Sequence, residues 1–260
     1  MLLSIDKLKK SFGGLTAVNE IDFHIDSGEI VCLIGPNGSG KTTFFNLLTG
    51  IYQPDSGNIS FTTDKEKLNI IGLKPHQINY AGISRTFQTI RLFANMTVIE
   101  NVMVGMHCRT RTSPLGAIIN TSFTKREEQE VKEKAFRLLH QYARTLAPLK
   151  NELAHNLPYA DQRRLEIVRA LASSPHLVLL DEPAAGMNPL ESKKLLADIK
   201  RIRDDGYAVL VIEHDLSVVK GLSDRVVVFD YGRKIAEGSF DEVRQNPHVI
   251  EAYLGKNVTC

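Results

Sequence analysis

The sequence predicts an α/β fold, in which helices cover a parallel β-sheet. Short apolar runs rich in β-branched residues occur at 30–34, 177–180 and 208–212. Between them lie longer segments of helical period, such as 125–143 and 191–204. The strands of a covered parallel sheet are buried on both faces and need helical crossovers, which accounts for both observations. We expect a single domain over the 260 residues.

The two helical segments are amphipathic, because their apolar residues recur at the spacing of one helix face. These residues are Leu195, Ile199 and Ile202 in one segment, and Val131, Ala135, Leu138 and Tyr142 in the other. No clear strand pattern occurs from about 89 to 170, so we expect a mostly helical insertion there.

A second, antiparallel sheet is expected beside the parallel one. The first 34 residues and the stretch from 57 to 72 are typical of short strands joined by turns. Residues 225–238 are typical of a hairpin. The turns are placed at Gly13-Gly14, Ser27-Gly28, Ser56-Gly57 and Tyr231-Gly232.

Composition and charge exclude some classes of partner. The chain is 43% hydrophobic and 24% charged, as in ordinary globular proteins. Its 32 basic and 30 acidic residues give a net charge of +2, so no global field draws it to nucleic acid or to an anionic membrane. We expect no nucleic-acid partner, and any membrane contact to go through another protein.

Several features favour a cytoplasmic setting. The longest apolar runs are about five residues, whereas a membrane-spanning helix needs about 20. The start, from Met1 to Asp6, meets a charge too early for a signal peptide. Three widely separated cysteines, Cys32, Cys108 and Cys260, indicate reduced thiols. His107-Cys108 lacks the spacing of a metal site.

Eight residues match the phosphate-loop pattern G-x-x-x-x-G-K-[ST] in full: Gly35, Pro36, Asn37, Gly38, Ser39, Gly40, Lys41 and Thr42. The strand at 30–34 precedes them and an apolar helix beginning near Lys41 follows, which argues against a chance glycine-rich turn. Glycines let successive N–H groups face phosphate oxygens, and Lys41 reaches the β and γ phosphates. The Thr42 hydroxyl suits Mg²⁺. The loop predicts binding of Mg²⁺ and a nucleoside triphosphate.

Two further strands end in polar residues at the same edge of the sheet. Asp181 and Glu182 follow the run at 177–180, where Asp181 could hold the Mg²⁺ shell and Glu182 could act as general base. Alternatively, the pair only caps the next helix. His214 follows the run at 208–212, where it could sense the γ phosphate or serve a structural role.

In this order, the residues resemble the ABC transporter ATPase family over nearly the whole chain. The resemblance implies a P-loop NTPase with a RecA-like parallel sheet, an antiparallel β-subdomain and a helical insertion subdomain. It also implies that ATP is the substrate and that Gln88 contacts the metal or the attacking water. The remaining roles are Walker A for residues 35–43, including Thr43, Walker B for Asp181 and Glu182, switch histidine for His214, and adenine stacking for Phe12. Phe12 could instead be a core residue.

The resemblance divides the single domain of residues 1–260 into three parts. Residues 1–88 and 171–240 would form the nucleotide-binding core with its antiparallel subdomain. Residues 89–170 would form the helical subdomain with the signature region. Residues 241–260 would form a C-terminal tail.

The signature departs from the family pattern L-S-G-G-Q, because Pro158, Tyr159, Ala160 and Asp161 follow Leu157. In the family, the signature completes the ATP site of the partner subunit. Pro158 offers neither hydroxyl nor N–H, Ala160 carries a side chain, and Asp161 adds a negative charge. The partner's site is therefore hypothesised to hydrolyse ATP more weakly. Asn188 replaces the usual aspartate that follows Walker B, and it can still cap a helix.

Finer features resemble the ATPases of branched-chain amino acid importers. They include residues 85–93, 162–167, 181–186 and 249–255. The cargo implied is a branched-chain or other neutral amino acid, with urea or short amides as the alternative. The resemblance implies a peripheral place on the cytoplasmic face of the membrane. The partners implied are permease subunits, an external solute-binding protein acting indirectly, and a second ATPase subunit, either a related chain in a heterodimer or a copy in a homodimer.

Two rival functions remain. A small-molecule kinase would not explain Gln88 and His214 together, and a soluble ABC ATPase of DNA repair or translation would need a coiled-coil insertion or a second cassette. Arg163, Arg164 and Arg169 share a helix, where a solvated or acid-paired face is favoured over a phosphate-binding patch.

Overall fold

The predicted parallel sheet is present in the computed structural model, which describes residues 1–63, 66–107 and 122–254. Its order is β10-β9-β3-β8-β7-β6, and only β9 and β10 pair antiparallel. The strands are β3 (Ile30–Ile34), β6 (Ile83–Arg85), β7 (Leu177–Asp181), β8 (Ala208–Ile212), β9 (Arg225–Asp230) and β10 (Arg233–Gly238). Every residue of β3, β7 and β8 is buried, as expected for a sheet covered on both faces.

The edge strand β6 was not predicted from the sequence. It is only three residues long, and its last two residues, Ser84 and Arg85, are polar. A pattern of that length cannot be distinguished from a loop. Its strand state depends on pairing with β7, where Ile83, Ser84 and Arg85 lie opposite Leu177, Val178 and Leu179.

The predicted antiparallel sheet has four strands in the order β2-β1-β4-β5. They are β1 (Leu3–Phe12), β2 (Leu15–Ile25), β4 (Ser56–Thr62) and β5 (Lys67–Asn69). The turn predicted at Gly13-Gly14 is confirmed. The turn predicted at Ser56-Gly57 is wrong, because these residues begin β4 and Ser56 pairs with Lys9 of β1. The helix α1 (Lys41–Leu48) buries Phe44 and Phe45 between the two sheets, in a core that both share.

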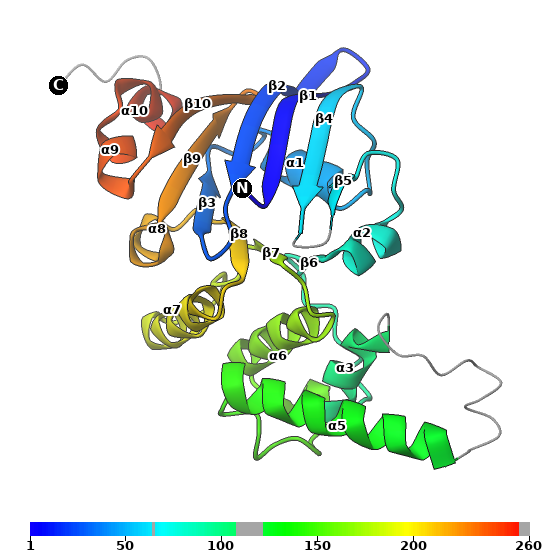
Figure 1. Ribbon diagram of the computed structural model, residues 1–260. Helices are drawn as coiled ribbons and strands as arrows, with labels where there is room; N and C mark the ends of the chain where they lie inside the picture. Colours follow the sequence, from blue (N-terminus) through cyan, green and yellow to red (C-terminus); the bar gives the residue numbers. More distant parts are fainter. Residues whose placement is uncertain (64–65, 108–121, 255–260) are drawn as a thin grey trace.

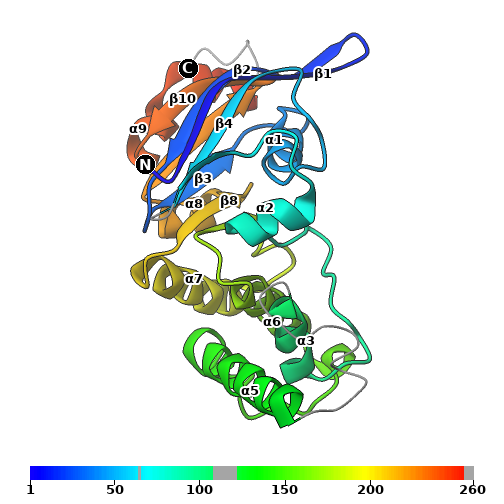
Figure 2. The same ribbon diagram turned by 45° about the vertical axis from the view of Figure 1, so that its right-hand side comes forward.

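The remaining helices surround the parallel sheet or extend from it (Figure 1). They are α2 (Pro75–Ala81), α3 (Val98–Gly105), α5 (Ser122–Tyr142), α6 (Tyr159–Ala172), α7 (Pro189–Asp204), α8 (Leu216–Leu222), α9 (Phe240–Gln245), α10 (Pro247–Leu254) and the 3₁₀ turn η2 (Ala154–Asn156). Figures 1 and 2 both place α3, α5 and α6 together at the end of the molecule away from the antiparallel sheet. The described part of residues 89–170 is thus largely helical, with one isolated bridge between Thr97 and Leu153.

Both predicted amphipathic helices are confirmed. In α7, Leu195, Ile199 and Ile202 are buried. In α5, Ala135 and Tyr142 are buried, and Val131 and Leu138 pack against the same core as partly buried residues.

The cap predicted at Asn188 is also confirmed. Its Oδ1 accepts hydrogen bonds from the N–H groups of Leu190 and Glu191, each at 3.0 Å, at the start of α7. The Glu191 carboxylate accepts the Asn188 N–H in return at 3.0 Å, which completes a capping box.

The apolar length of the helices and the state of the cysteines can be compared with the predictions in the described part of the chain. Within residues 1–63, 66–107 and 122–254, no helix is long and apolar enough to cross a lipid bilayer. Cys32 lies in β3 as a buried free thiol, and burial raises the pKa of its thiol. Cys108, Cys260 and Gly255 lie outside the described residues.

Replacing Gly40 with alanine should destabilise the protein more than the same change at Gly38. Both have positive φ, 103° and 81°, which costs an L residue about 1–2 kcal/mol. A Cβ at Gly40 would in addition overlap the backbone carbonyl oxygen of Ala17, whereas nothing lies within 4 Å of a Cβ at Gly38. Urea unfolding of the two variants without nucleotide measures the difference. Equal losses in free energy of unfolding would contradict the close packing of Gly40 on β2.

Candidate functional site

The predicted phosphate loop joins the end of β3 to the start of α1, as the sequence pattern requires. Lys41 folds back over the loop, and its Nζ donates to the carbonyl oxygens of Gly35 at 2.7 Å and Pro36 at 2.9 Å and to Ser39 Oγ at 3.3 Å. Burial lowers the pKa of Lys41, while the nearby charges of Glu182 and Asp181 oppose this effect. Thr42 and Thr43 follow in the first turn of α1. The loop therefore presents a cation and a helix N-terminus on one surface.

The carboxyl edge of the sheet brings the three predicted catalytic residues together. Gln88 Nε2 donates to Glu182 Oε2 at 3.0 Å. His214 Nδ1 lies 3.6 Å from Glu182 Oε1. Glu182 has a φ of 46°, a left-handed conformation that is rare for a residue with a side chain. A strained residue held between two polar partners at a strand end is typical of a functional site.

The donors assigned to Mg²⁺ are a hydroxyl, a carboxylate and an amide: Thr42, Asp181 and Gln88. In the part of the chain that the structure describes, no cluster of three or more His, Cys, Asp or Glu residues is arranged to hold a metal. Mg²⁺ usually takes one or two protein oxygens and completes its shell with waters and substrate phosphates. This sparse set of hard oxygen atoms therefore fits Mg²⁺ that arrives with a nucleotide.

Sequence reasoning missed the role of Arg85. Its Nη2 donates to Asp181 Oδ2 at 2.9 Å, and the two side chains are only 7% and 9% exposed. Its Nη1 donates to Asn46 Oδ1 at 2.7 Å, and its guanidinium lies 5.3 Å and 5.1 Å from the ring centroids of Phe45 and Phe87. These two hydrogen bonds link β6 to β7 and to α1. Arg85 was noted only as part of a family motif, because its partner is 96 positions away.

Glu213, between β8 and His214, was not among the predicted site residues. It is 1% exposed, and its carboxylate accepts hydrogen bonds from the N–H groups of Ala184 at 3.1 Å and His214 at 3.2 Å. Burial raises the pKa of Glu213, and these two bonds oppose the shift. Glu213 thus ties the segment after Glu182 to the strand end that carries His214.

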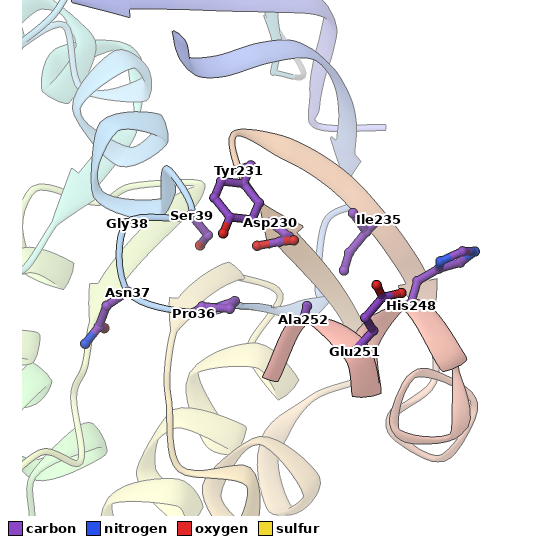
Figure 3. A pocket seen from close by; sticks show the side chains of 10 residues that line it. All are labelled: Pro36, Asn37, Gly38, Ser39, Asp230, Tyr231, Ile235, His248, Glu251 and Ala252. Carbon is purple, nitrogen blue, oxygen red and sulfur yellow. The ribbon is translucent and has the colours of Figure 1, made fainter. Parts of the chain in front are cut away.

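The C-terminal helix α10 packs beside the phosphate loop. A cavity of about 730 Å³ lies between them. In Figure 3, Ala252 of α10 lies nearest Pro36 of the phosphate loop, and Asp230 and Tyr231 come from the hairpin of β9 and β10. Burial raises the pKa of Tyr253, and a hydrogen bond with the Gly35 backbone opposes this. Residues expected in a tail therefore include a helix that lines the same cavity as the phosphate loop.

Phe12 is the last residue of β1. It is 43% exposed, so the alternative of a buried core residue is wrong. Its ring packs edge-on against Tyr52, with centroids 5.2 Å apart, and Lys10 Nζ lies 5.5 Å from its centroid. The adenine-stacking role stays a prediction.

The signature residues form the start of α6. Pro158 precedes the helix, Tyr159 is 47% exposed and Ala160 is buried. Asp161 accepts a hydrogen bond from Arg164 Nη1 at 3.1 Å, which offsets its negative charge. Arg163 and Arg164 are both buried and paired with acidic side chains. Of the two alternatives predicted for this helix face, the acid-paired face is therefore confirmed for these residues and the solvated face is wrong.

Arg85→Ala should lower the free energy of unfolding by about 3–5 kcal/mol, because it leaves Asp181 buried without a counter-charge. The matched control is Arg126→Ala on α5, which removes an exposed pair with Glu130 and should cost less than about 0.5 kcal/mol. Denaturant unfolding of both variants measures the losses. If the two losses are alike, the pair with Asp181 contributes no more than a surface contact.

Comparisons with known proteins agree with this architecture. A family model described as ABC transporter matches residues 18–185, and one described as branched-chain amino acid ATP-binding cassette transporter matches residues 233–259. A solved nucleotide-free ATP-binding cassette from an ABC transporter is 32% identical, with a TM-score of 0.83 over 98% of this chain and 99% of that chain. The ADP conformation of a cassette gives the same identity, TM-score and coverage.

Curated relatives match along nearly their whole length. The high-affinity branched-chain amino acid transport ATP-binding protein LivG of Salmonella typhimurium is 43% identical over 256 residues, covering 98% of each chain. The corresponding protein BraF of Pseudomonas aeruginosa is 42% identical with the same coverage. Neither rival function accounts for similarity of this extent. The chain belongs to the ABC transporter ATP-binding family, and within it to the ATPase subunits of the branched-chain amino acid transport type.

Proposed function

We propose that this chain hydrolyses Mg-ATP to drive uptake of a branched-chain or other neutral amino acid through a membrane permease. The observation that carries the proposal is the convergence of Gln88 and His214 on Glu182, at the sheet edge beside Lys41. The names of the relatives support the amino acid cargo. Urea or a short amide is the alternative cargo.

In the proposed reaction, the phosphate loop binds the triphosphate through its N–H groups and Lys41. Glu182 accepts a proton from a water molecule as the water oxygen attacks the γ phosphorus. The bond from that phosphorus to the β–γ bridging oxygen breaks, and ADP leaves. Gln88 and His214 orient the water and the γ phosphate. Thr42, Asp181 and Gln88 would hold Mg²⁺, which neutralises phosphate charge when bound.

The second ATP site would form with another ATPase subunit, across the N-terminus of α6. Pro158 and Tyr159 offer no serine hydroxyl there, which supports weaker hydrolysis at the partner's site. The Ala160 methyl group is buried, and Asp161 is paired with Arg164. We therefore attribute the effect mainly to the missing hydroxyl and N–H of Pro158. A related but different chain is the preferred partner, and a homodimer is the alternative.

A groove beside Gln88 is the proposed docking place of a permease segment. It has a volume of about 430 Å³ and lies between β6 and helices α3 and α6. Its lining combines apolar Phe87, Phe93 and Val104 with basic Arg91 and Arg169. Phe93 is 47% exposed. Two aromatic side chains, each with a cation beside it, suit a short polar segment of a membrane subunit. Such a segment would lie next to the loop that carries Gln88.

Glu182→Gln should bind ATP but lose roughly 10²- to 10⁴-fold in hydrolysis, because the amide cannot accept the proton. The assay follows phosphate release, with and without Mg²⁺, in membranes that contain the chain with its cognate subunits. Uptake of labelled leucine and labelled urea in the same membranes identifies the cargo. Removing Mg²⁺ should stop both activities.

The matched control is Glu191→Gln. Its carboxylate only caps α7, and glutamine can make the same capping bond, so the rate should stay near that of the wild type. Retained hydrolysis in Glu182→Gln would refute the assignment of the base. Binding of ATP without turnover by the assembled wild type would make this subunit a regulatory partner.

Phe93→Ala should weaken association with the permease on the order of tenfold or more, as loss of an aromatic anchor does. ATP affinity of the isolated chain should not change. Phe136→Ala on α5 is the control, since Phe136 is 37% exposed but lies outside the groove. Co-purification from membranes at graded detergent and salt measures association. Equal retention of both variants would place the docking surface elsewhere.

A further inference from the structure

Arg163 is a charged side chain with no solvent exposure, and it holds the backbone of the segment that carries Gln88. Its side chain is 0% exposed. Nη1 donates to the carbonyl oxygen of Phe87 and Nη2 to that of Gln88, each at 2.6 Å. Charge-assisted bonds of this length are among the stronger hydrogen bonds in proteins. Two adjacent carbonyl groups are thus fixed by one planar guanidinium.

Glu166, one helical turn further along α6, completes the arrangement. Its Oε2 accepts from Arg163 Nη1 at 2.8 Å, which compensates the buried charge. Its Oε1 accepts the backbone N–H of Arg91 at 3.2 Å. The two side chains therefore hold the backbone on both sides of Gln88, and both belong to the helix that begins at the signature.

The contacts continue in both directions from Arg163. Tyr159, in the signature, accepts a weak hydrogen bond from Arg163 Nη2 at 3.4 Å. The Tyr159 ring also lies close to Gly186, in the segment that follows Glu182, at 3.6 Å from an added Cβ. At the other end, the Gln88 amide donates to Glu182. A short chain of contacts thus joins the signature residue Tyr159 to the proposed general base.

We infer that Arg163 is a positioning residue for hydrolysis: it sets the backbone of Gln88, and so the direction of the Gln88 side chain, from the helix that begins at the signature. The inference rests on the proposed role of Gln88. Its consequence is that contact between the signature and the partner's ATP site affects the geometry of this chain's own site. Lysine cannot replace arginine in this role, because one ammonium group cannot present two parallel N–H bonds to adjacent carbonyls.

The test is a double-mutant cycle between Arg163→Lys and Gln88→Ala, read as kcat and KM for ATP in the assembled transporter. Arg163→Lys should lower kcat roughly tenfold to 100-fold through misplacement of Gln88, with little change in KM. In the Gln88→Ala background, the same substitution should have no further effect on kcat. A purely structural role would instead lower kcat by the same factor in both backgrounds.

Arg164→Lys is the matched control. Arg164 is the next residue of α6, is buried and is paired with Asp161 and Asp198, but donates nothing to the segment of Gln88. Any effect on kcat should be the same in both backgrounds. If Arg163→Lys does not assemble, the cycle is run with Arg163→Met and Glu166→Leu combined, since apolar replacement of a whole buried ion pair is often tolerated.

The outcomes separate this inference from the proposed function. Equal factors for Arg163→Lys in both backgrounds overturn the inference and leave the proposed function intact. A wild-type rate in Gln88→Ala also overturns it, since there is then nothing for Arg163 to position. The proposed function fails separately, if the assembled wild type binds ATP without hydrolysing it.

Discussion

The need to compensate buried charge shapes the centre of this protein. A guanidinium removed from water is tolerated when its charge is compensated. Asp181 compensates the charge of Arg85, and Glu166 compensates that of Arg163, which also donates to two backbone carbonyls. The Nε of each arginine is buried and has no hydrogen-bond partner among the described residues. Each partner set spans different elements of the fold. The segment that carries Gln88 is therefore held at one end from the parallel sheet and along its length from α6.

The phosphate loop depends on close backbone packing instead. The Gly232 N–H donates to the Ser39 carbonyl at 3.0 Å, and the Asn19 N–H donates to the Gly232 carbonyl at 2.8 Å. These bonds connect the loop to the hairpin of β9 and β10 and to β2. Gly40 has no room for a side chain against β2. Antiparallel elements on two sides thus define the loop whose shape the proposed phosphate contacts require.

The proposed chemistry lies between two supports. One is the central sheet with α1, and the other is the helical layer of α3, α5 and α6. Lys41 and Asp181 belong to elements of the central sheet and its first helix. Gln88 lies where that sheet meets the helical layer of α3, α5 and α6, and the groove proposed for the permease lies next to it. A residue in this place contacts both Glu182, the proposed base, and the helix of the signature. Its position suits a link between hydrolysis, partner binding and transport.

The sequence by itself determined the family and predicted the chemistry, because the phosphate loop and the strand-end acids are local patterns. Residues that are neighbours in the chain define the loop with its flanking strand and helix. In the same way, they place Asp181 and Glu182 at a strand end. The amphipathic faces of α5 and α7 and the antiparallel sheet could also be predicted, since periodicity reports burial.

Only the tertiary structure decided which distant residues meet. Arg85 and Asp181 are 96 positions apart, and Arg163 and Phe87 are 76 apart. Strand β6 is too short to carry a pattern of its own, and the contact of α10 with the phosphate loop leaves no local signal. Local patterns predict which apolar faces are buried, but the partner of a buried charge depends on how the chain folds back on itself.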